Sequence, residues 1–380
     1  HYTSEHLSVL LLALALWSLW RNRPADAAPA AGPSADWIAG GFLLGLLPWA
    51  KLQSAPMGAA IGLWAVAIVW CDRRIATTGR IRWLGGLAAG ALAPTALMLG
   101  LIASTGQFEQ FRVSYFTANF AYMDGGLTWP AVLASLAGAM HFTWQLPAFL
   151  GGAGLLLAAH AVWSLGHRHN PGPLYWGSAA ATGAALYALC APRHAFFHYL
   201  LLFVVPLVLW AAVAALELLA APLSPKTRRM FVCAFIGLGA LPPLALRILH
   251  GPPENYGRLA ADWRHPYGDI ARHIRAVARP GDRLAMWGWE PHLFVETGLP
   301  QGTRSAHSEI QLRVWPLRDS FFRPRYLAEI RASRPLFFVD AVGPDSFGYD
   351  KREIDGHETF PGLRDFIATQ YVLVRDFGSE

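Results

Sequence analysis

Cationic, imidazole and aromatic side chains gather directly before one of the most apolar segments of the chain. Residues 192–199 read Pro-Arg-His-Ala-Phe-Phe-His-Tyr and run into the apolar segment 200–210. Arg and His at the edge of hydrocarbon are costly unless they hold something anionic, while Phe and Tyr suit the aromatic belt of a membrane interface. The stretch therefore predicts a membrane protein that binds a charged head group where the lipid begins.

Three chemistries are open to the polar side chains of this stretch. His194 and His198 are four residues apart, which puts two candidate metal ligands on one helical face, but the neighbouring sequence offers no clear third ligand. Arg193 with a histidine partner can instead bind a phosphate, or the stretch can simply anchor the chain at the interface. We favour phosphate binding by Arg193 and His198 and assign no metal ligand.

Two more ionisable residues lie at the ends of apolar segments. Lys51, the only lysine among the first 225 residues, lies in a tight turn with Gln53, and a lysine can pair with a phosphate as a point charge. The alternative is a turn lysine that only reaches from the bilayer edge to water. Glu5 begins the first apolar segment, where it could contact a metal or an acceptor, although helix N-termini favour acids on electrostatic grounds alone.

A polar and aromatic stretch, 104–126, follows the fourth apolar segment. At helical spacing, and so on one expected face, it carries Phe108, Phe111, Tyr115, Asn119 and Tyr122. The pattern predicts an amphipathic helix in the membrane interface. Such a helix could roof a lipid-facing cavity, with Asn119 and Tyr122 as hydrogen-bonding groups, or could simply lie on the membrane surface.

A sharp change in composition indicates the elements that position these residues. Residues 1–249 carry 14 Lys and Arg and 7 Asp and Glu, and are about 8% charged. Residues 250–380 carry 17 Lys and Arg and 18 Asp and Glu, and are about 27% charged. This fraction is close to the roughly 25% of a soluble domain. We expect a polytopic α-helical membrane domain at 1–249 and a small α/β domain at 250–380. The charge excess in the first part favours basic loops at a membrane surface over nucleic-acid binding.

Eight apolar segments are expected to cross the membrane. They are 6–20, 36–50, 54–71, 83–103, 142–164, 174–191, 199–220 and 230–249. One set of alternate loops holds Arg21, Arg23, Arg73, Arg74, Arg80, Arg82, Arg168, Lys226, Arg228 and Arg229, and the other set holds Lys51, Arg112, Arg193 and Arg247. The positive-inside rule places the first set in the cytoplasm. The parts then expected outside are His1–Glu5, Lys51, the 104–141 loop, the Arg193 stretch and the whole of 250–380.

The second domain is expected to alternate helices with buried strands, which implies a parallel sheet. Helices are predicted at 268–279, 291–297, 324–333 and 361–369, strands at 283–287, 335–340 and 371–374, and a polar loop at 341–358. The domain contains no phosphate-binding glycine motif and no zinc spacing. Three cysteines are too few for a disulfide framework. With the Ala-, Gly- and Arg-rich composition, they favour a protein of the bacterial inner membrane.

In order and spacing, the residues above resemble those of a known superfamily. The chain is similar to the C-terminal two-thirds of a bacterial GT-C fold membrane glycosyltransferase. The superfamily includes the dolichyl-phosphate-mannose protein mannosyltransferases (glycosyltransferase family 39) and the lipid A aminoarabinose transferases. The resemblance covers nearly all of the chain. It rests on Ser4-Glu5, the run 39–53 (AGGFLLGLLPWAKLQ), Phe111–Tyr115 with Asn119 and Tyr122, Arg193 with His198, Tyr199 and Pro206, and Met286–Pro291 with Arg304.

The resemblance implies an enzyme that moves a sugar from a polyprenyl-phosphate donor to a glycan, lipid or protein acceptor at the outer face of the membrane. It implies donor-phosphate binding by Lys51, Arg193 and His198, with a divalent metal as a candidate cofactor. Further candidate contacts to donor or acceptor are Glu5, Gln53, Tyr115, Asn119, Tyr122, His194 and Tyr199. The family's catalytic carboxylate follows its first span. Since this chain begins at His1, in mid-pattern, we expect that region to be missing and the chain alone to be inactive.

The competing class is non-enzymatic: a multispan transporter or flippase, or a lipid-binding accessory protein, with an exported domain. A transporter is expected to carry broken helices at corresponding positions of two halves and charges at mid-membrane. In this chain the apolar segments hold almost no charge, and the polar residues collect at one face. That distribution favours chemistry at the membrane surface over a path through it.

Overall fold

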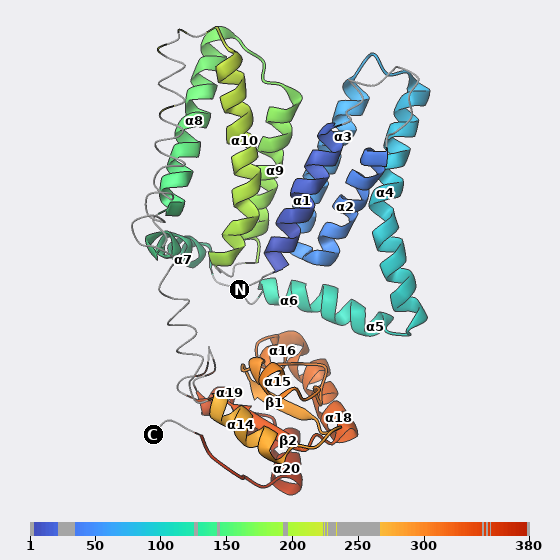
Figure 1. The fold of residues 1–380 in the computed structure, drawn as a ribbon, viewed down its shortest axis with the longest axis vertical. Coiled ribbons are helices and arrows are strands. Elements are labelled where there is room, and N and C mark those ends of the chain that lie inside the picture. The colour runs from blue at the N-terminus through green and yellow to red at the C-terminus, as the bar shows by residue number, and fades with distance from the viewer. Residues whose placement is uncertain are drawn as a thin grey trace. The chain divides into compact units, whose positions relative to one another are not determined.

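The computed structural model describes residues 4–21, 35–124, 128–142, 145–192, 197–222, 267–343 and 351–377, with residues 224, 226, 233, 346 and 349 as single positions. They form two compact units. The first holds the described residues of 1–113 and 126–249, and the second those of 114–125 and 250–380. Helices dominate both units, and the second also contains a small sheet (Figure 1).

The first unit is a set of apolar helices. Its helices are α1 (Ser4–Arg21), α2 (Ala35–Ala50), α3 (Ala55–Cys71), α4 (Thr77–Ser104), α5 (Phe108–Phe111), α7 (Trp129–Phe142), α8 (Gln145–His167), α9 (Pro173–Cys190) and α10 (Leu200–Ala220). Among the described residues, four segments are long and apolar enough to cross a membrane: Leu52–Cys71, Thr77–Ser104, Phe149–His167 and Leu200–Ala220. Their length and composition are those of a membrane protein.

The expected apolar segments coincide with helices wherever the structure describes them. The first seven expected segments correspond, in order, to α1, α2, α3, α4, α8, α9 and α10. The eighth, 230–249, lies outside the described residues apart from Cys233. One helix was not expected: α7 falls within the part of the chain assigned to an outer loop, and its 14 residues are too few to cross a bilayer alone.

Helices α2 and α4 approach each other closely because glycine lies at the contact. A Cβ atom on Gly45 would lie 2.1 Å from the carbonyl oxygen of Ala91. A Cβ on Gly90 would lie 2.2 Å from the carbonyl oxygen of Ile38. Small residues allow helices in membranes to pack backbone against backbone. The run 39–53 therefore has a packing role beside any functional one.

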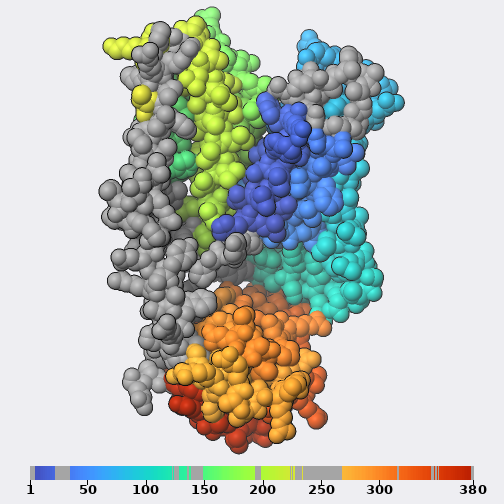
Figure 2. Space-filling model, viewed as in Figure 1, coloured from blue at the N-terminus to red at the C-terminus, as the bar shows by residue number. Residues whose placement is uncertain are grey.

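Three further helices of the first unit pack against α10. It contacts α8, α9 and α1, and α3 packs on α9. Figure 2 shows α1 (blue) and α10 (yellow-green) meeting in one continuous surface. The core beneath includes the fully buried side chains of Leu12, Leu47 and Leu202, which come from α1, α2 and α10. The N-terminal end of α10 is thus held next to the start of α1.

The expected amphipathic helix is helical but does not present one uniform face. α5 continues into a π-helical segment, η3 (Arg112–Thr117), and then into α6 (Ala118–Asp124). Phe108 and Asn119 are exposed, whereas Phe111 and Tyr115 are half-buried. A π-helical turn takes one more residue than an α-helical turn, so the three-to-four residue spacing loses its phase. The expectation of one shared face is therefore wrong, and the boundary between the two units falls inside this stretch.

The second unit contains a parallel two-stranded sheet, as its sequence pattern predicts. β1 (Leu284–Gly288) pairs with β2 (Phe337–Ala341), with Leu284 opposite Phe337 and Gly288 opposite Ala341. The main helices are α14 (Tyr267–Val277), α15 (His292–Thr297), α18 (Arg323–Ser333) and α20 (Pro361–Gln370). Shorter elements are α16 (Glu309–Leu312), α17 (Trp315–Leu317), η6 (Arg318–Phe322), α19 (Arg352–Asp355) and η7 (His357–Thr359).

β1 is apolar throughout because helices cover both of its faces. Leu284 and Met286 pack with residues of α14 and α15. Ala285 and Trp287 pack with residues of α18 and α20 on the opposite face. A strand buried on both faces needs a continuous apolar run rather than an alternating one. It ends at Gly288, whose φ of +101° and close approach to Ala341 both require glycine.

Two expectations for the second unit are wrong. The stretch 341–358, expected to be a loop, contains the short helix α19 and the start of η7. The strand expected at 371–374 does not form: Val372, Leu373 and Val374 are largely exposed, and these residues join neither strand of the sheet. β-branched and apolar residues favour a strand only where a partner strand is in reach.

Candidate functional site

Residues from three distant segments meet at one end of the helical unit. Glu5 lies in the first turn of α1, Lys51 directly after α2, and His198 and Tyr199 in the 3₁₀ turn η4 (Phe197–Tyr199) before α10. The Lys51 ammonium forms an ion pair with the Glu5 carboxylate. His198 Nε2 lies 3.7 Å from Glu5 Oε1, and Lys51 Nζ lies 4.3 Å from the centre of the Tyr199 ring. We call these four residues the Glu5–Lys51 cluster.

The turn between α2 and α3 presents Lys51 in a defined position. α2 ends at Ala50, and Lys51 itself is extended, with φ −162° and ψ 123°. The hydroxyl of Ser54, which is fully buried, donates to the carbonyl oxygens of Leu47 and Lys51 at 2.7 and 2.6 Å. Pro56 follows in the first turn of α3. These bonds hold the backbone on both sides of Lys51, so the lysine does not lie on a freely moving loop.

Burial makes the charges of the cluster depend on one another. The side chain of Glu5 is 1% exposed and that of Lys51 is 18% exposed. A buried carboxylate is costly unless a cation compensates it, and the face of Tyr199 adds a cation–π contact to the ammonium. Burial lowers the pKa of His198, the Glu5 carboxylate raises it, and Lys51 lowers it further, for a net decrease. A neutral His198 leaves the four residues with no net charge.

Two other predicted site residues form hydrogen bonds elsewhere in the described structure. The Gln53 amide donates to the backbone carbonyl of Ala188 at 3.0 Å, which joins the turn to the end of α9. The Asn119 amide donates to the carbonyl of Tyr115 at 2.6 Å, one turn back in its own helical stretch. Tyr115, Asn119 and Tyr122 belong to the second unit, and the Tyr122 side chain is not described. Arg193 and His194 lie outside the described residues.

A second polar group, which the sequence analysis missed, lies at the opposite end of α10. Glu217 Oε2 lies 2.8 Å from His160 Nε2 of α8 and 3.3 Å from His169 Nε2 in the loop before α9. His160 is fully buried. The signal in the sequence was the single acid in an otherwise apolar helix, because an ionisable residue in a membrane segment is a site hypothesis by default. We call these residues the His160–Glu217 group.

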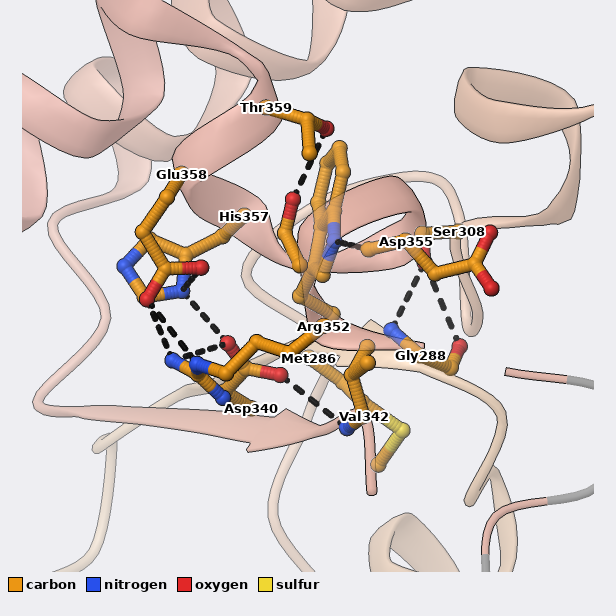
Figure 3. A network of polar contacts seen from close by, with 12 residues as sticks. Met286, Gly288, Ser308, Asp340, Val342, Arg352, Asp355, His357, Glu358 and Thr359 are labelled. Carbon is orange, nitrogen blue, oxygen red and sulfur yellow. Dashed lines mark hydrogen bonds and ion pairs between the residues drawn. The ribbon is translucent and has the colours of Figure 1, made fainter. Parts of the chain in front are cut away.

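A third group lies at the carboxyl end of β2 (Figure 3). His357 Nδ1 contacts the carboxylate of Asp340, and Arg352 Nη2 lies 3.2 Å from Asp340 and 2.5 Å from Glu358. Asp340, His357 and Glu358 together have the donor atoms of a metal site. Arg352 already supplies the cation, however, so this group is better explained as an ion-pair network. Arg352, His357 and Glu358 come from the stretch that was expected to be a polar loop, whereas Asp340 belongs to the expected strand.

The Glu5–Lys51 cluster and the His160–Glu217 group lie at opposite ends of one membrane helix. His198 lies two residues before α10, and Glu217 lies in its last turn. A helical rise of 1.5 Å per residue puts about 28 Å between them, close to the hydrocarbon thickness of a bilayer. No protein-family model, curated protein or solved structure matches the chain. The function must therefore be argued from the chemistry of these residues.

Proposed function

We propose that the protein transfers a sugar from a polyprenyl-phosphate donor to an acceptor at the outer face of a bacterial inner membrane. The observation that carries this proposal is the meeting of Glu5, Lys51 and His198 at one end of the helical unit. The charge of the loops had assigned all three of their segments to the outer face. Their contact supports a single site there, on a unit whose helices are long and apolar enough to cross the membrane.

The chemistry of sugar transfer matches the groups in and beside the cluster. Breaking a sugar–phosphate bond leaves negative charge on the departing phosphate, which positioned cations and hydrogen-bond donors stabilise. Lys51 is a point charge for that phosphate, and neutral His198 is a hydrogen-bond donor. Because Glu5 cancels the charge of Lys51, Arg193 supplies the net positive charge that binding of an anion requires. We assign the role of the base that activates the acceptor to no residue of this chain.

A divalent metal does not fit the described residues of this cluster. Glu5 and His198 offer a carboxylate oxygen and an imidazole nitrogen 3.7 Å apart. The Lys51 ammonium already occupies the Glu5 carboxylate and would repel a second cation there. The proposed transfer therefore takes its net positive charge from Arg193, and no step is assigned to a metal.

The test is sugar transfer by the complete protein in proteoliposomes at limiting donor, comparing Arg193→Ala with wild type. A charge-assisted hydrogen bond contributes about 1.5–3 kcal/mol, so we expect the KM for the donor to rise roughly 10- to 100-fold. The matched control is Arg112→Ala, because Arg112 is also assigned to an outer loop but is exposed and pairs with Glu109 at 2.6 Å. Unchanged transfer by Arg193→Ala, with the control also unchanged, would rule the proposal out.

One observation favours a non-enzymatic alternative. The described cluster has no net charge, because Glu5 neutralises Lys51 and burial favours neutral His198. A cluster without net charge gives little stabilisation to the negative charge that develops on a departing phosphate, so Arg193 can bind the lipid phosphate without any bond being broken. An accessory protein of this kind would bind the polyprenyl-phosphate sugar in the same proteoliposomes, lose that binding in Arg193→Ala, and give no sugar transfer.

A further inference from the structure

We propose that His160, His169 and Glu217 bind a divalent transition metal of the zinc type. The proposed site lies at the end of α10 opposite the Glu5–Lys51 cluster. It does not depend on sugar transfer, because no residue is shared between the two sites.

The three side chains have the donor atoms and the spacing of a metal site. Both histidines turn Nε2 toward the same carboxylate oxygen of Glu217, at 2.8 and 3.3 Å. The three ligand atoms all lie within 4.8 Å of one another. Two imidazoles and one carboxylate are a frequent zinc ligand set, and they leave a fourth position of the tetrahedron for water or another ligand.

Each ligand is held in place by a neighbour that is not itself a ligand. The second oxygen of Glu217 accepts the backbone N–H of Gly172 at 3.0 Å. The His160 ring stacks on Tyr175, with ring centres 4.5 Å apart and an angle of 25°. The His169 ring lies 4.6 Å from the ring centre of Trp163. Support of this kind keeps a ligand set in position before the ion arrives.

The apolar surroundings favour a cation between these side chains. Glu217 lies in α10, which contains no basic residue, and both of its ion-pair partners in the described part of the chain are histidines. His160 Nδ1 is buried without a hydrogen-bond partner, so the polar contact of this ring is made by Nε2 toward Glu217. A bound divalent ion would compensate the carboxylate without requiring a charged, buried imidazole. At Asp340, by contrast, Arg352 already compensates the charge of the carboxylate.

Metal binding also sets the proton positions on the rings. A metal takes the Nε2 lone pair, so each neutral histidine must carry its proton on Nδ1. Protonation of either ring competes with the ion, because a metal ligand must offer a free lone pair.

The experiment is a Zn²⁺ titration by calorimetry of the full chain, purified in detergent and first stripped with a chelator. We expect one saturable ion per chain at this site. His169→Ala and Glu217→Gln should weaken binding by more than about tenfold, the loss that even outer-shell changes cause at metal sites. Glu217→Gln retains a carbonyl oxygen for the Gly172 N–H. The matched control is His167→Ala, since His167 lies two residues from His169 but bonds to the Trp163 carbonyl at 2.9 Å.

Three results would overturn the proposal: no saturable ion, wild-type binding by both site variants, or an equal loss in His167→Ala. A second measurement covers the case in which the variants do not fold. X-ray absorption at the zinc edge of the wild-type chain should show imidazole nitrogen at about 2.0–2.1 Å. A sulfur shell would place the ion at one of the three cysteines instead, and a shell of oxygen alone would exclude the histidines.

Discussion

The Lys51 ammonium lies 4.3 Å from the centre of the Tyr199 ring, so the α2–α3 turn meets the start of α10 directly. The same ammonium pairs with Glu5 at the start of α1. Three membrane-type helical segments are thus joined at one end by a buried ion pair and an aromatic face, in addition to their apolar contacts. The cluster should therefore contribute to stability as well as to any binding of a phosphate.

Removing the lysine alone should destabilise the first unit. Lys51→Met removes the cation that pairs with the Glu5 carboxylate, which is 1% exposed. Breaking a buried pair in this way costs about 3–5 kcal/mol, whereas replacing both members costs far less. Unfolding of the purified chain in a denaturing detergent should therefore show a large loss for Lys51→Met and recovery in Glu5→Gln/Lys51→Met. If the double variant is no more stable than the single one, the carboxylate is not buried as described.

The contact between α2 and α4 makes a sharp prediction for two glycines. Gly45→Ala places a methyl group 2.1 Å from the Ala91 carbonyl oxygen, so the two helix backbones must separate. Overpacking of this kind costs about 1–3 kcal/mol. Gly100→Ala in α4 is the matched control, because nothing lies within 4 Å of its Cβ position. The same unfolding assay should show the loss only for Gly45→Ala, and a neutral Gly45→Ala would contradict the close approach of α2 and α4.

The second unit should lose stability as the pH rises through neutrality, because of His292. Its Nδ1 lies 3.1 Å from Glu290, and this hydrogen bond raises the pKa of His292 above 6.5. A raised folded-state pKa adds stability that is complete below the unfolded pKa and disappears as the pH passes the folded pKa. At pH 6 the amides of β1 should therefore exchange more slowly in wild type than in His292→Gln. This difference should shrink at pH 8.

The comparison with His292→Gln is needed because other groups in the unit titrate as well. Burial lowers the pKa of His307, which makes the unit less stable as the pH falls. Burial raises the pKa of Glu309, which makes the unit less stable as the pH rises. These contributions are the same in wild type and His292→Gln, so the difference between the two isolates His292. Hydrogen–deuterium exchange of peptides that cover 284–288 gives the measurement, and an equal pH response in both proteins would refute the role of His292.

Features that depend on local pattern could be predicted from the sequence. The length of each apolar run is enough to place α3, α4 and α10, and continuous apolar residues between breakers are enough to place β1 and β2. The strand predicted at 371–374 was wrong because that prediction also used local pattern alone. Strand-favouring residues form a ladder only with a partner strand in reach, and local pattern does not reveal the partner.

The sites depend on contacts between distant residues, and prediction was correspondingly partial. Loop charges were sufficient to assign Glu5, Lys51 and His198 to one side of the membrane, but not to predict that they touch. His160 and Glu217 lie 57 positions apart in the sequence, so no local spacing indicates that their helices bring them together. What the sequence offered was a lone acid in an apolar helix, and the packing of α8 against α10 turns that acid into a group with two histidines.

The proposed topology predicts which loops are reached from outside the cell. Thr105, after α4, and Asn170, between α8 and α9, are both exposed, and loop charges assign them to opposite faces. A cysteine at each position can be introduced after Cys71, Cys190 and Cys233 are changed to serine. A membrane-impermeant maleimide should label Thr105→Cys in intact cells and Asn170→Cys only after lysis. The reverse pattern would put the Glu5–Lys51 cluster in the cytoplasm, away from a lipid-linked donor at the outer face, and labelling of both in intact cells would exclude a crossing between them.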